Sequence, residues 1–161
     1  MKKTFLLSLL AVAVSAAVMA NPGETIAVST GRIEHLTIAG GMNVVLVAVA
    51  ESNGNITLEP NASEKLSLKV SGNSLQVSML KRYSAAEKPT VYLYVGNLKS
   101  ITVESNSQVK TVGILNAPLL DVFVDGESRV HLRSNGRIDA HPLSDGELHV
   151  KYLAGSPWAK R

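Results

Sequence analysis

Cysteine is absent from this chain of 161 residues, and aromatic side chains are scarce. Without cysteine the protein forms no disulfide, and it cannot be a lipoprotein acylated on a cysteine just after its signal. A domain of this composition depends on its hydrophobic core alone. Only 4% of the residues are Phe, Trp or Tyr, which leaves few platforms on which nucleic-acid bases could stack.

Charge of either sign is modest. The sequence has 16 Lys and Arg against 13 Asp and Glu, a net charge of +3. The basic residues are scattered along the sequence, whereas nucleic-acid binding usually needs a clustered basic face interleaved with aromatics. We therefore expect no nucleic-acid partner.

The one long hydrophobic run lies at the N-terminus. Lys2 and Lys3 precede the apolar residues 5–19, and Ala20 ends the run with a small side chain. This layout is typical of a secretory signal peptide cleaved between Ala20 and Asn21. An uncleaved anchor is the alternative, but a bilayer span needs about 20 apolar residues.

We predict that residues 1–20 are removed, and that residues 21–161 form a single domain with no transmembrane segment. Loss of the two signal lysines lowers the net charge to +1. The expected location is the periplasm or the outside of the cell.

Helical periodicity is missing after the signal, and apolar residues instead alternate with polar ones. Such segments indicate strands with one buried face, and their many β-branched residues support this assignment. Residues 66–70 and 75–79 form a predicted hairpin, because Gly72 and Asn73 tolerate the positive φ of a tight turn. Residues 82–89 are a predicted exposed loop.

A turn-plus-strand phrase recurs three times in the second half of the chain, beginning at residues 105, 126 and 144. It brings Val109, Val130 and Leu148 to matching positions, 21 and then 18 residues apart. A period near 20 is typical of stacked β coils. We therefore expect an all-β fold: a short parallel solenoid continuous with an N-terminal strand and hairpin region.

Stacked coils place outward side chains in ladders about 4.8 Å apart. Lys110, His131 and His149 form one predicted ladder. Asp125-Gly126 and Asp145-Gly146 are predicted tight-turn pairs that let the coil bend.

Several structural motifs carry a family resemblance over about residues 31–151. They include Gly72-Asn73-Ser74-Leu75 in the hairpin and a Val-x-Gly-x-Ser-x-Val phrase that is intact at residues 124–130. On these motifs the chain resembles the putative auto-transporter adhesin head GIN domain family, a bacterial extracytoplasmic domain of unknown function. The resemblance implies a right-handed parallel β-helix. Ser105 departs from the pattern, which has glycine there, and the chain holds fewer coils than fuller members.

Two groups of residues could hold a metal ion. His131 and His149 could share a transition metal across one ladder step, but metal sites usually bring three or four ligands. The triplets at residues 125–127 and 145–147 place acids beside turns, as calcium-binding repeats do, but those repeats are far denser in Gly and Asp. We expect solvated side chains here, with no metal and no cofactor.

Four aspartates could supply the carboxylate pair of a glycan-cleaving enzyme. They are Asp121, Asp125, Asp139 and Asp145. No Lys or Arg cluster accompanies them, and the sequence has no Ser-His-Asp order, phosphate loop or dinucleotide fingerprint. We therefore expect a protein that is not an enzyme.

Trp158 is the only tryptophan and follows the last coil. We predict that residues 153–158 cover the open end of the stack as a cap, the alternative being a disordered tail.

The favoured function is adhesion or binding at the cell envelope, with an unknown envelope glycan or protein as partner. The candidate binding face consists of outward residues, namely Tyr92, Tyr94, Lys110, His131 and His149. A structural or self-assembly module of the periplasm or cell surface is the alternative, and a glycan-cleaving enzyme comes third. The sequence leaves the ligand and the oligomeric state open.

Overall fold

The computed structural model describes residues 26–29, 31–50, 55–58, 62–80, 88–153 and 156–158. The predicted signal peptide and most of the predicted loop at residues 82–89 lie outside this part of the chain. Within the described residues, every regular element is a strand except the single 3-10 turn Ser63–Lys65 (η1). None of these residues belongs to a helix long and apolar enough to cross a membrane.

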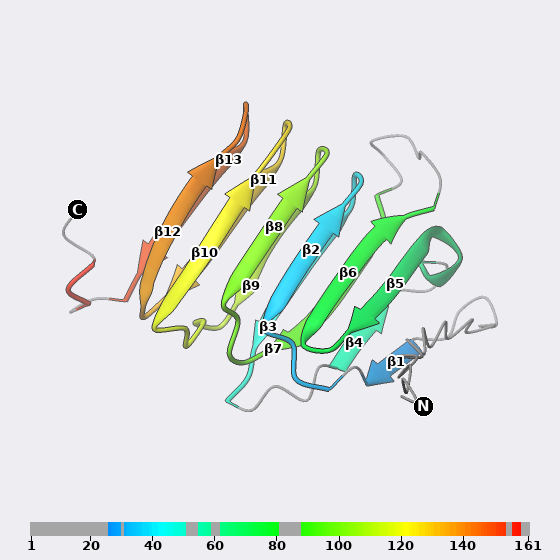
Figure 1. The fold of residues 1–161 in the computed structure, drawn as a ribbon, viewed down its shortest axis with the longest axis horizontal. Coiled ribbons are helices and arrows are strands. Elements are labelled where there is room, and N and C mark those ends of the chain that lie inside the picture. Colours follow the sequence, from blue (N-terminus) through cyan, green and yellow to red (C-terminus); the bar gives the residue numbers. More distant parts are fainter. Residues whose placement is uncertain are drawn as a thin grey trace, which may run out of the picture.

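Two mixed sheets lie one behind the other (Figure 1). In spatial order, the six-stranded sheet contains β12 (Arg137–Pro142), β10 (Leu119–Val124), β8 (Ser100–Glu104), β2 (His35–Ala39), β6 (Ser74–Met79) and β5 (Leu66–Ser71). The seven-stranded sheet contains β1 (Ile26–Ser29), β4 (Asn55–Leu58), β7 (Thr90–Val95), β3 (Asn43–Ala48), β9 (Gln108–Val112), β11 (Arg129–Ser134) and β13 (Glu147–Tyr152). The all-β prediction is confirmed.

Five pairs of consecutive strands place one strand in each sheet, and we call each pair a rung. In spatial order the rungs are β6–β7, β2–β3, β8–β9, β10–β11 and β12–β13. Neighbouring rungs pair in parallel in both sheets. At one edge, β5, β4 and β1 add antiparallel strands, and β5 with β6 forms the predicted hairpin.

The rungs do not follow chain order. The β2–β3 rung comes first in the sequence but lies between β6–β7 and β8–β9. It pairs with the β8–β9 rung at one constant, large separation along the sequence, as in His35↔Ser100 and Asn43↔Gln108. The expected N-terminal strand and hairpin region is therefore partly wrong, because its β2–β3 segment belongs to the parallel stack.

The register of the second half agrees with the sequence. Val130 pairs with Val109 on one side and with Leu148 on the other. On the opposite face of the same strand, His131 pairs with Lys110 and His149. The predicted column and ladder are both confirmed.

The core lies between the sheets and is almost wholly aliphatic. Inward residues such as Ile38, Ile101 and Val122 are buried completely, whereas their chain neighbours face outward. A buried aliphatic side chain contributes roughly 1.5–3 kcal/mol, and an exposed ion pair roughly 0–1 kcal/mol. The aliphatic column therefore holds the two sheets together, and the surface charges contribute little.

The turn from the first sheet to the second has the same length in each rung from β2–β3 onward, since the strands on both sides of it stay in register. In three of these four turns the backbone is left-handed, at Gly40 (φ 97°), Ser105 (φ 59°), Asn106 (φ 58°) and Gly126 (φ 64°), whereas residues 143–146 of the β12–β13 rung have no positive φ. Ser105 thus adopts the strained conformation that Gly40 and Gly126 take in two equivalent turns.

Two serines at this turn point inward and are fully buried. The Oγ of Ser107 lies 2.6 Å from the carbonyl oxygen of Gly40, and the Ser107 N–H donates to the Oγ of Ser128 over 3.3 Å. These bonds link three rungs and satisfy polar groups that would otherwise be costly to bury.

The return turn between rungs explains why the repeated phrase is more closely spaced between its second and third copies. Residues 113–118 connect β9 to β10, whereas only Asn135 and Gly136 connect β11 to β12. The two turns stay stacked: the Nδ2 of Asn135 donates to the Oδ1 of Asn116 over 2.8 Å. A Cβ atom on Gly136 would overlap the carbonyl oxygen of Ala117.

The C-terminal end of the stack is incompletely covered. The inward side chains of β13, which are Leu148, Val150 and Tyr152, are only partly buried. Trp158 lies against this end, with its ring centre 5.8 Å from the Arg137 guanidinium. Residues 154–155 of the predicted cap lie outside the described part, and Leu153 keeps 41% of its surface exposed.

Replacing Gly136 by alanine tests the tight return turn. We expect G136A to lower the free energy of unfolding by about 3 kcal/mol or more, because the obstructing atoms belong to backbone and cannot rotate away. The control is G41A, whose added Cβ meets nothing closer than 3.7 Å. Urea unfolding of the three proteins provides the measurement, and equal losses in both variants would refute this account of the turn.

Candidate functional site: the outer face of the seven-stranded sheet

In-register pairing arranges the outward side chains of the seven-stranded sheet in rows. One row runs Tyr92, Val45, Lys110, His131 and His149, from β7 to β13. A second row passes through Tyr94, Val47 and Val112. On β11 and β13, Arg133 and Lys151 continue it. The five residues predicted from the sequence as a binding face therefore lie on one surface.

A hollow of about 440 Å³ lies over the first row. Tyr92, Lys110 and His131 line it, together with Asn43, Gln108 and Arg129. Val45 points outward but is only 3% exposed, and its register partners are Tyr92 and Lys110. The ring of Tyr92 and the aliphatic stem of Lys110 thus flank an apolar floor. Tyr94 and His149 do not line this hollow.

His131 and His149 stack with ring centroids 4.9 Å apart and planes 9° from parallel. The Oε2 of Glu147 lies 4.0 Å from the Nε2 of His149. In the described part of the chain, no three His, Asp or Glu side chains come together as metal ligands would.

Basic side chains gather on this face, contrary to the scattered distribution inferred from the sequence. The strands carry Lys110, Arg129, Arg133 and Lys151 as exposed cations, with Glu147 as the only acid among the described strands of this sheet. The inference failed because residues about 20 apart in the sequence become neighbours about 4.8 Å apart. We call this surface, with Tyr92, Tyr94, His131 and His149, the cationic face.

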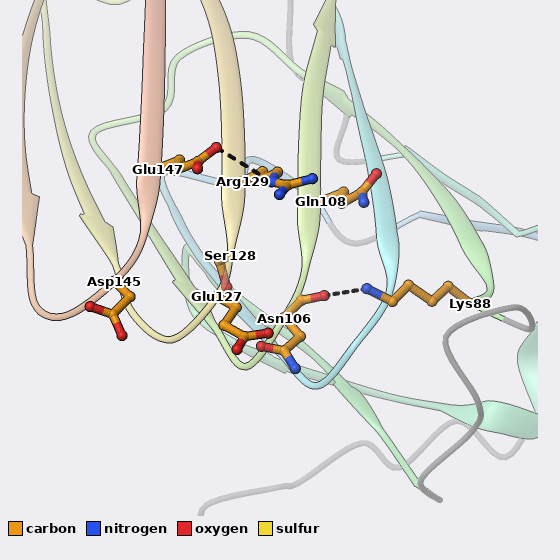
Figure 2. Close-up of a pocket in the computed structure, with 8 residues that line it drawn as sticks. All are labelled: Lys88, Asn106, Gln108, Glu127, Ser128, Arg129, Asp145 and Glu147. Atoms are coloured by element: carbon orange, nitrogen blue, oxygen red, sulfur yellow. Dashed lines mark hydrogen bonds and ion pairs between the residues drawn. The ribbon is translucent and has the colours of Figure 1, made fainter.

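A second hollow of about 360 Å³ lies at the turn edge of the same sheet (Figure 2). Glu127, Asp145 and Glu147 are among its lining residues. Glu147 is held by Arg129 over 3.3 Å, and Lys88 Nζ donates to the backbone oxygen of Asn106 over 2.6 Å. In Figure 2 the Asp145 carboxylate points away from Glu127, so these acids do not converge on one point.

The two acid-glycine-acid triplets are not equivalent in space, although they look alike in the sequence. The register that pairs Arg129 with Glu147 places Gly126 beside Ser144 and Asp125 beside Leu143. The residues of the first triplet therefore do not lie beside the matching residues of the second. The Oγ of Ser144 donates to Asp125 over 2.7 Å, and the Gly126 N–H donates over 2.8 Å. The Ser144 hydroxyl and then this backbone N–H lower the pKa of Asp125. The Asp125 carboxylate thus stabilises the turn by accepting these two hydrogen bonds. The second triplet also differs in its backbone, because Gly146 lacks the left-handed φ of Gly126.

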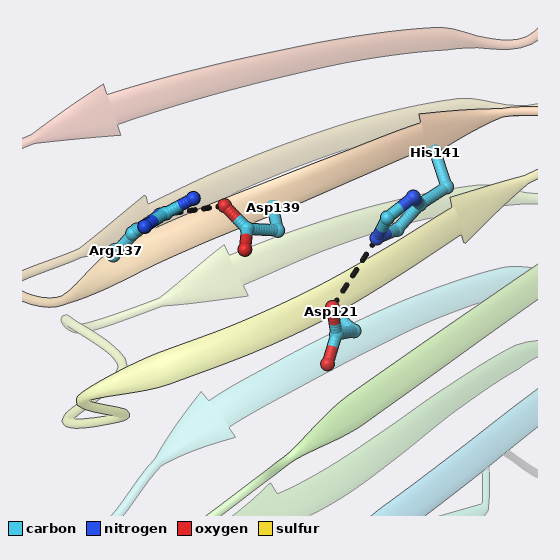
Figure 3. A network of polar contacts seen from close by, with 4 residues as sticks. All are labelled: Asp121, Arg137, Asp139 and His141. Atoms are coloured by element: carbon cyan, nitrogen blue, oxygen red, sulfur yellow. Dashed lines mark hydrogen bonds and ion pairs between the residues drawn. The ribbon is translucent and has the colours of Figure 1, made fainter.

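The outer face of the six-stranded sheet carries local polar pairs instead of a row of cations (Figure 3). Arg137 Nε donates to Asp139 over 2.6 Å, and His141 Nε2 lies 3.2 Å from Asp121. The His141 ring also stacks on Phe123, with centroids 4.6 Å apart. Two of the aspartates considered for an enzyme are therefore held in surface pairs.

Glu34 is a charged residue that the sequence reasoning missed. It lies just before β2, is only 8% exposed, and contacts Lys99 over 2.7 Å and Arg32 over 3.2 Å. Its backbone bonds to Asn73 and Lys99 join the entries of three neighbouring rungs. A hydrogen bond from Lys99 lowers the pKa of Glu34. Desolvation by burial raises this pKa in part, and a hydrogen bond from Asn73 lowers it further.

The family of the chain follows from a direct comparison. The model of the family described as putative auto-transporter adhesin, head GIN domain, matches residues 32–155. The chain belongs to this family, which confirms the resemblance inferred from the motifs. The family is described as an adhesin domain and not as an enzyme. No curated protein matches the chain.

Solved bacterial structures resemble the chain at low identity. A putative adhesin from Parabacteroides distasonis is 14% identical with a TM-score of 0.48, over 80% of this chain and 64% of that one. A putative adhesin from Bacteroides fragilis is 10% identical with a TM-score of 0.39, over 81% of this chain and 96% of that one. The chain thus spans less than two thirds of the Parabacteroides protein.

The ion pairs of Glu34 predict a defined pH dependence. Its pKa in the folded protein lies below the ordinary value of 4.5, so its stabilising contribution is fully present above pH 4.5. That contribution is lost as the pH falls through the lowered folded-state pKa. We expect E34Q to lower the urea midpoint at neutral pH, and the difference from the unmodified protein to shrink on acidification. The control is E64Q, an exposed acid in η1, and a difference independent of pH would contradict the assignment.

Proposed function

We propose that residues 21–161 form one exported, non-enzymatic domain that adheres to the bacterial cell envelope through the cationic face. We further propose that its rungs constitute a short right-handed parallel β-solenoid. The partner is an envelope glycan or protein. Lys2, Lys3 and the apolar residues after them support export, as the features of a signal peptide.

One observation carries the proposal. Three strands contribute Lys110, His131 and His149 as exposed, in-register side chains on a rigid sheet. Tyr92 extends this row over a hollow with an apolar floor. A convergent set of aromatic and polar groups on a rigid surface is what recognition of an extended ligand requires.

The arrangement of carboxylates supports a binding role over glycan cleavage. Glycoside hydrolysis needs two carboxyl groups facing each other across the scissile bond. In the 360 Å³ hollow, Glu147 is paired with Arg129, and Asp145 points away from Glu127.

Removing the two tyrosines tests the proposed face. We expect the Y92A/Y94A double variant to bind isolated bacterial envelope fractions at least about tenfold more weakly than the unmodified protein, because stacking area and the cover of Val45 are lost. The control F123A removes an aromatic ring from the opposite sheet and should bind normally. Thermal unfolding checks that both variants are folded. Unchanged binding by Y92A/Y94A would remove the face from consideration.

Self-assembly is a second candidate function, favoured by the open end of the stack. Among the strands that the structure describes, β12 and β13 each have a hydrogen-bonded neighbour on one side only, and Leu148 and Val150 remain partly exposed beside them. A parallel edge with an apolar end can accept a further copy of the chain.

Light scattering distinguishes assembly from binding. If the end self-associates, the molar mass should rise with concentration, and V150K should return the protein to a monomer. The control V112K places the same substitution on the exposed outer face of β9. A mass independent of concentration in the unmodified protein would eliminate this candidate.

A further inference from the structure

Charge is segregated between the two outer faces. The strands of the seven-stranded sheet carry four Lys or Arg and one acid. Those of the six-stranded sheet carry Lys69 and Arg137 against three acids. The whole chain is nearly balanced, so this asymmetry arises from the fold and not from the composition.

The two faces differ in how many cations lack an ion-pair partner among the described residues. On the six-stranded sheet Arg137 is paired with Asp139, and Lys69 alone is unpaired. On the seven-stranded sheet Arg129 is paired with Glu147. For Lys110, Arg133 and Lys151, none of the carboxylates in the described residues lies within ion-pair distance. These three side chains are exposed, and they keep their charge available for a ligand.

The spacing of the groups fits a linear polymer. Across the strands the row through Lys110 repeats about every 4.8 Å, and along β11 successive outward residues Arg129, His131 and Arg133 are about 6.6 Å apart. A chain lying across the strands would meet Lys110 on β9, and then Arg133 on β11 and Lys151 on β13, which lie one outward position further along their strands. At the β7 end it would reach Tyr92, whose ring can pack against the apolar side of a sugar.

We propose that the ligand of the cationic face is a linear polysaccharide bearing carboxylate or sulfate groups, which lies across the strands from Tyr92 toward His149. This inference rests on the proposed binding function and specifies its ligand class. The combination of separated point charges with a small aromatic and aliphatic area, Tyr92 beside Val45, matches a charged sugar chain. An export signal would bring the protein to the compartment in which such polymers occur.

Paired polymers that differ only in charge provide the probes. Dextran sulfate is compared with dextran, and polygalacturonate with its methyl ester, by titration calorimetry on the purified protein. We expect both anionic polymers to bind and both neutral polymers to fail. Raising the salt from about 0.1 to 1 M shortens the Debye length from about 10 to 3 Å and should weaken binding at least tenfold.

Charge reversal locates the site. K110E should weaken binding of both anionic polymers about tenfold or more, because an attraction becomes a repulsion at the centre of the row. The matched control is K69E, which changes the net charge equally on the outer face of β5 and should leave affinity within about twofold. E147Q releases Arg129 from its ion pair and should strengthen binding.

The outcomes separate this inference from the proposed function. If neutral glycans bind and Y92A/Y94A abolishes that binding while K110E does not, the face is a binding site but its ligand is not anionic. Equal effects of K110E and K69E would show non-specific attraction and overturn the inference. Stronger binding to oligothymidylate or to phosphatidylglycerol vesicles than to the anionic polysaccharides would overturn it in favour of a nucleic acid or a membrane. Absence of binding to any glycan, together with normal envelope binding by Y92A/Y94A, would refute both proposals.

Discussion

In-register parallel pairing is the constraint on which the rest of the structure depends. Each residue lies beside the equivalent residue of the next rung, so any choice of side chain is repeated about every 4.8 Å. Inward, the repetition produces a continuous aliphatic column from Leu36 and Ile101 to Val122. Outward, it produces rows in which like side chains become neighbours. The fold therefore creates its surface pattern as directly as it creates its core.

Such repetition is unfavourable for charge, because like charges side by side repel. Arg133 beside Lys151 gains nothing for folding. The stack tolerates them because the column of buried aliphatic side chains supplies the stability and water screens the surface. Polar groups inside the stack, unlike the surface charges, need a hydrogen-bonding partner, because water does not reach them. Ser107 and Ser128 are acceptable there because each finds a hydrogen-bonding partner across the turn.

The sequence predicted what depends on local pattern. Alternation identified the strands, Gly72-Asn73 identified the hairpin, and the shared phrase aligned Val109 with Val130 and Leu148. It did not predict that β2–β3 would enter the stack between two later segments, because that choice is made by pairing between segments far apart in the sequence. A turn of equal length in β2–β3 and β8–β9 was the available signal.

The residues of the candidate face were likewise predicted only in part from the local sequence pattern. Its five predicted residues lie on one surface, but Arg133 and Lys151 were missed because the basic residues were judged by their distance along the chain. Superposing successive copies of the repeated phrase would have brought them together. Glu34 was beyond such reasoning, since its partners Arg32 and Lys99 meet at a junction between rungs and share no repeat.

The two outer faces use charge in different ways. On the six-stranded sheet, Arg137 and His141 are engaged with aspartates of the same surface, and only Lys69 has no such partner among the described residues. On the seven-stranded sheet, Lys110, Arg133 and Lys151 have no such partner among the described residues. An exposed ion pair contributes only roughly 0–1 kcal/mol, so leaving these cations unpaired costs the fold little. Each could make only a weak contact with a ligand. Contacts repeated along one polymer are intramolecular after the first, however, so a row of weak contacts can give tight binding without any deep pocket. A sheet face that carries unpaired cations on three neighbouring strands is well suited to that form of recognition.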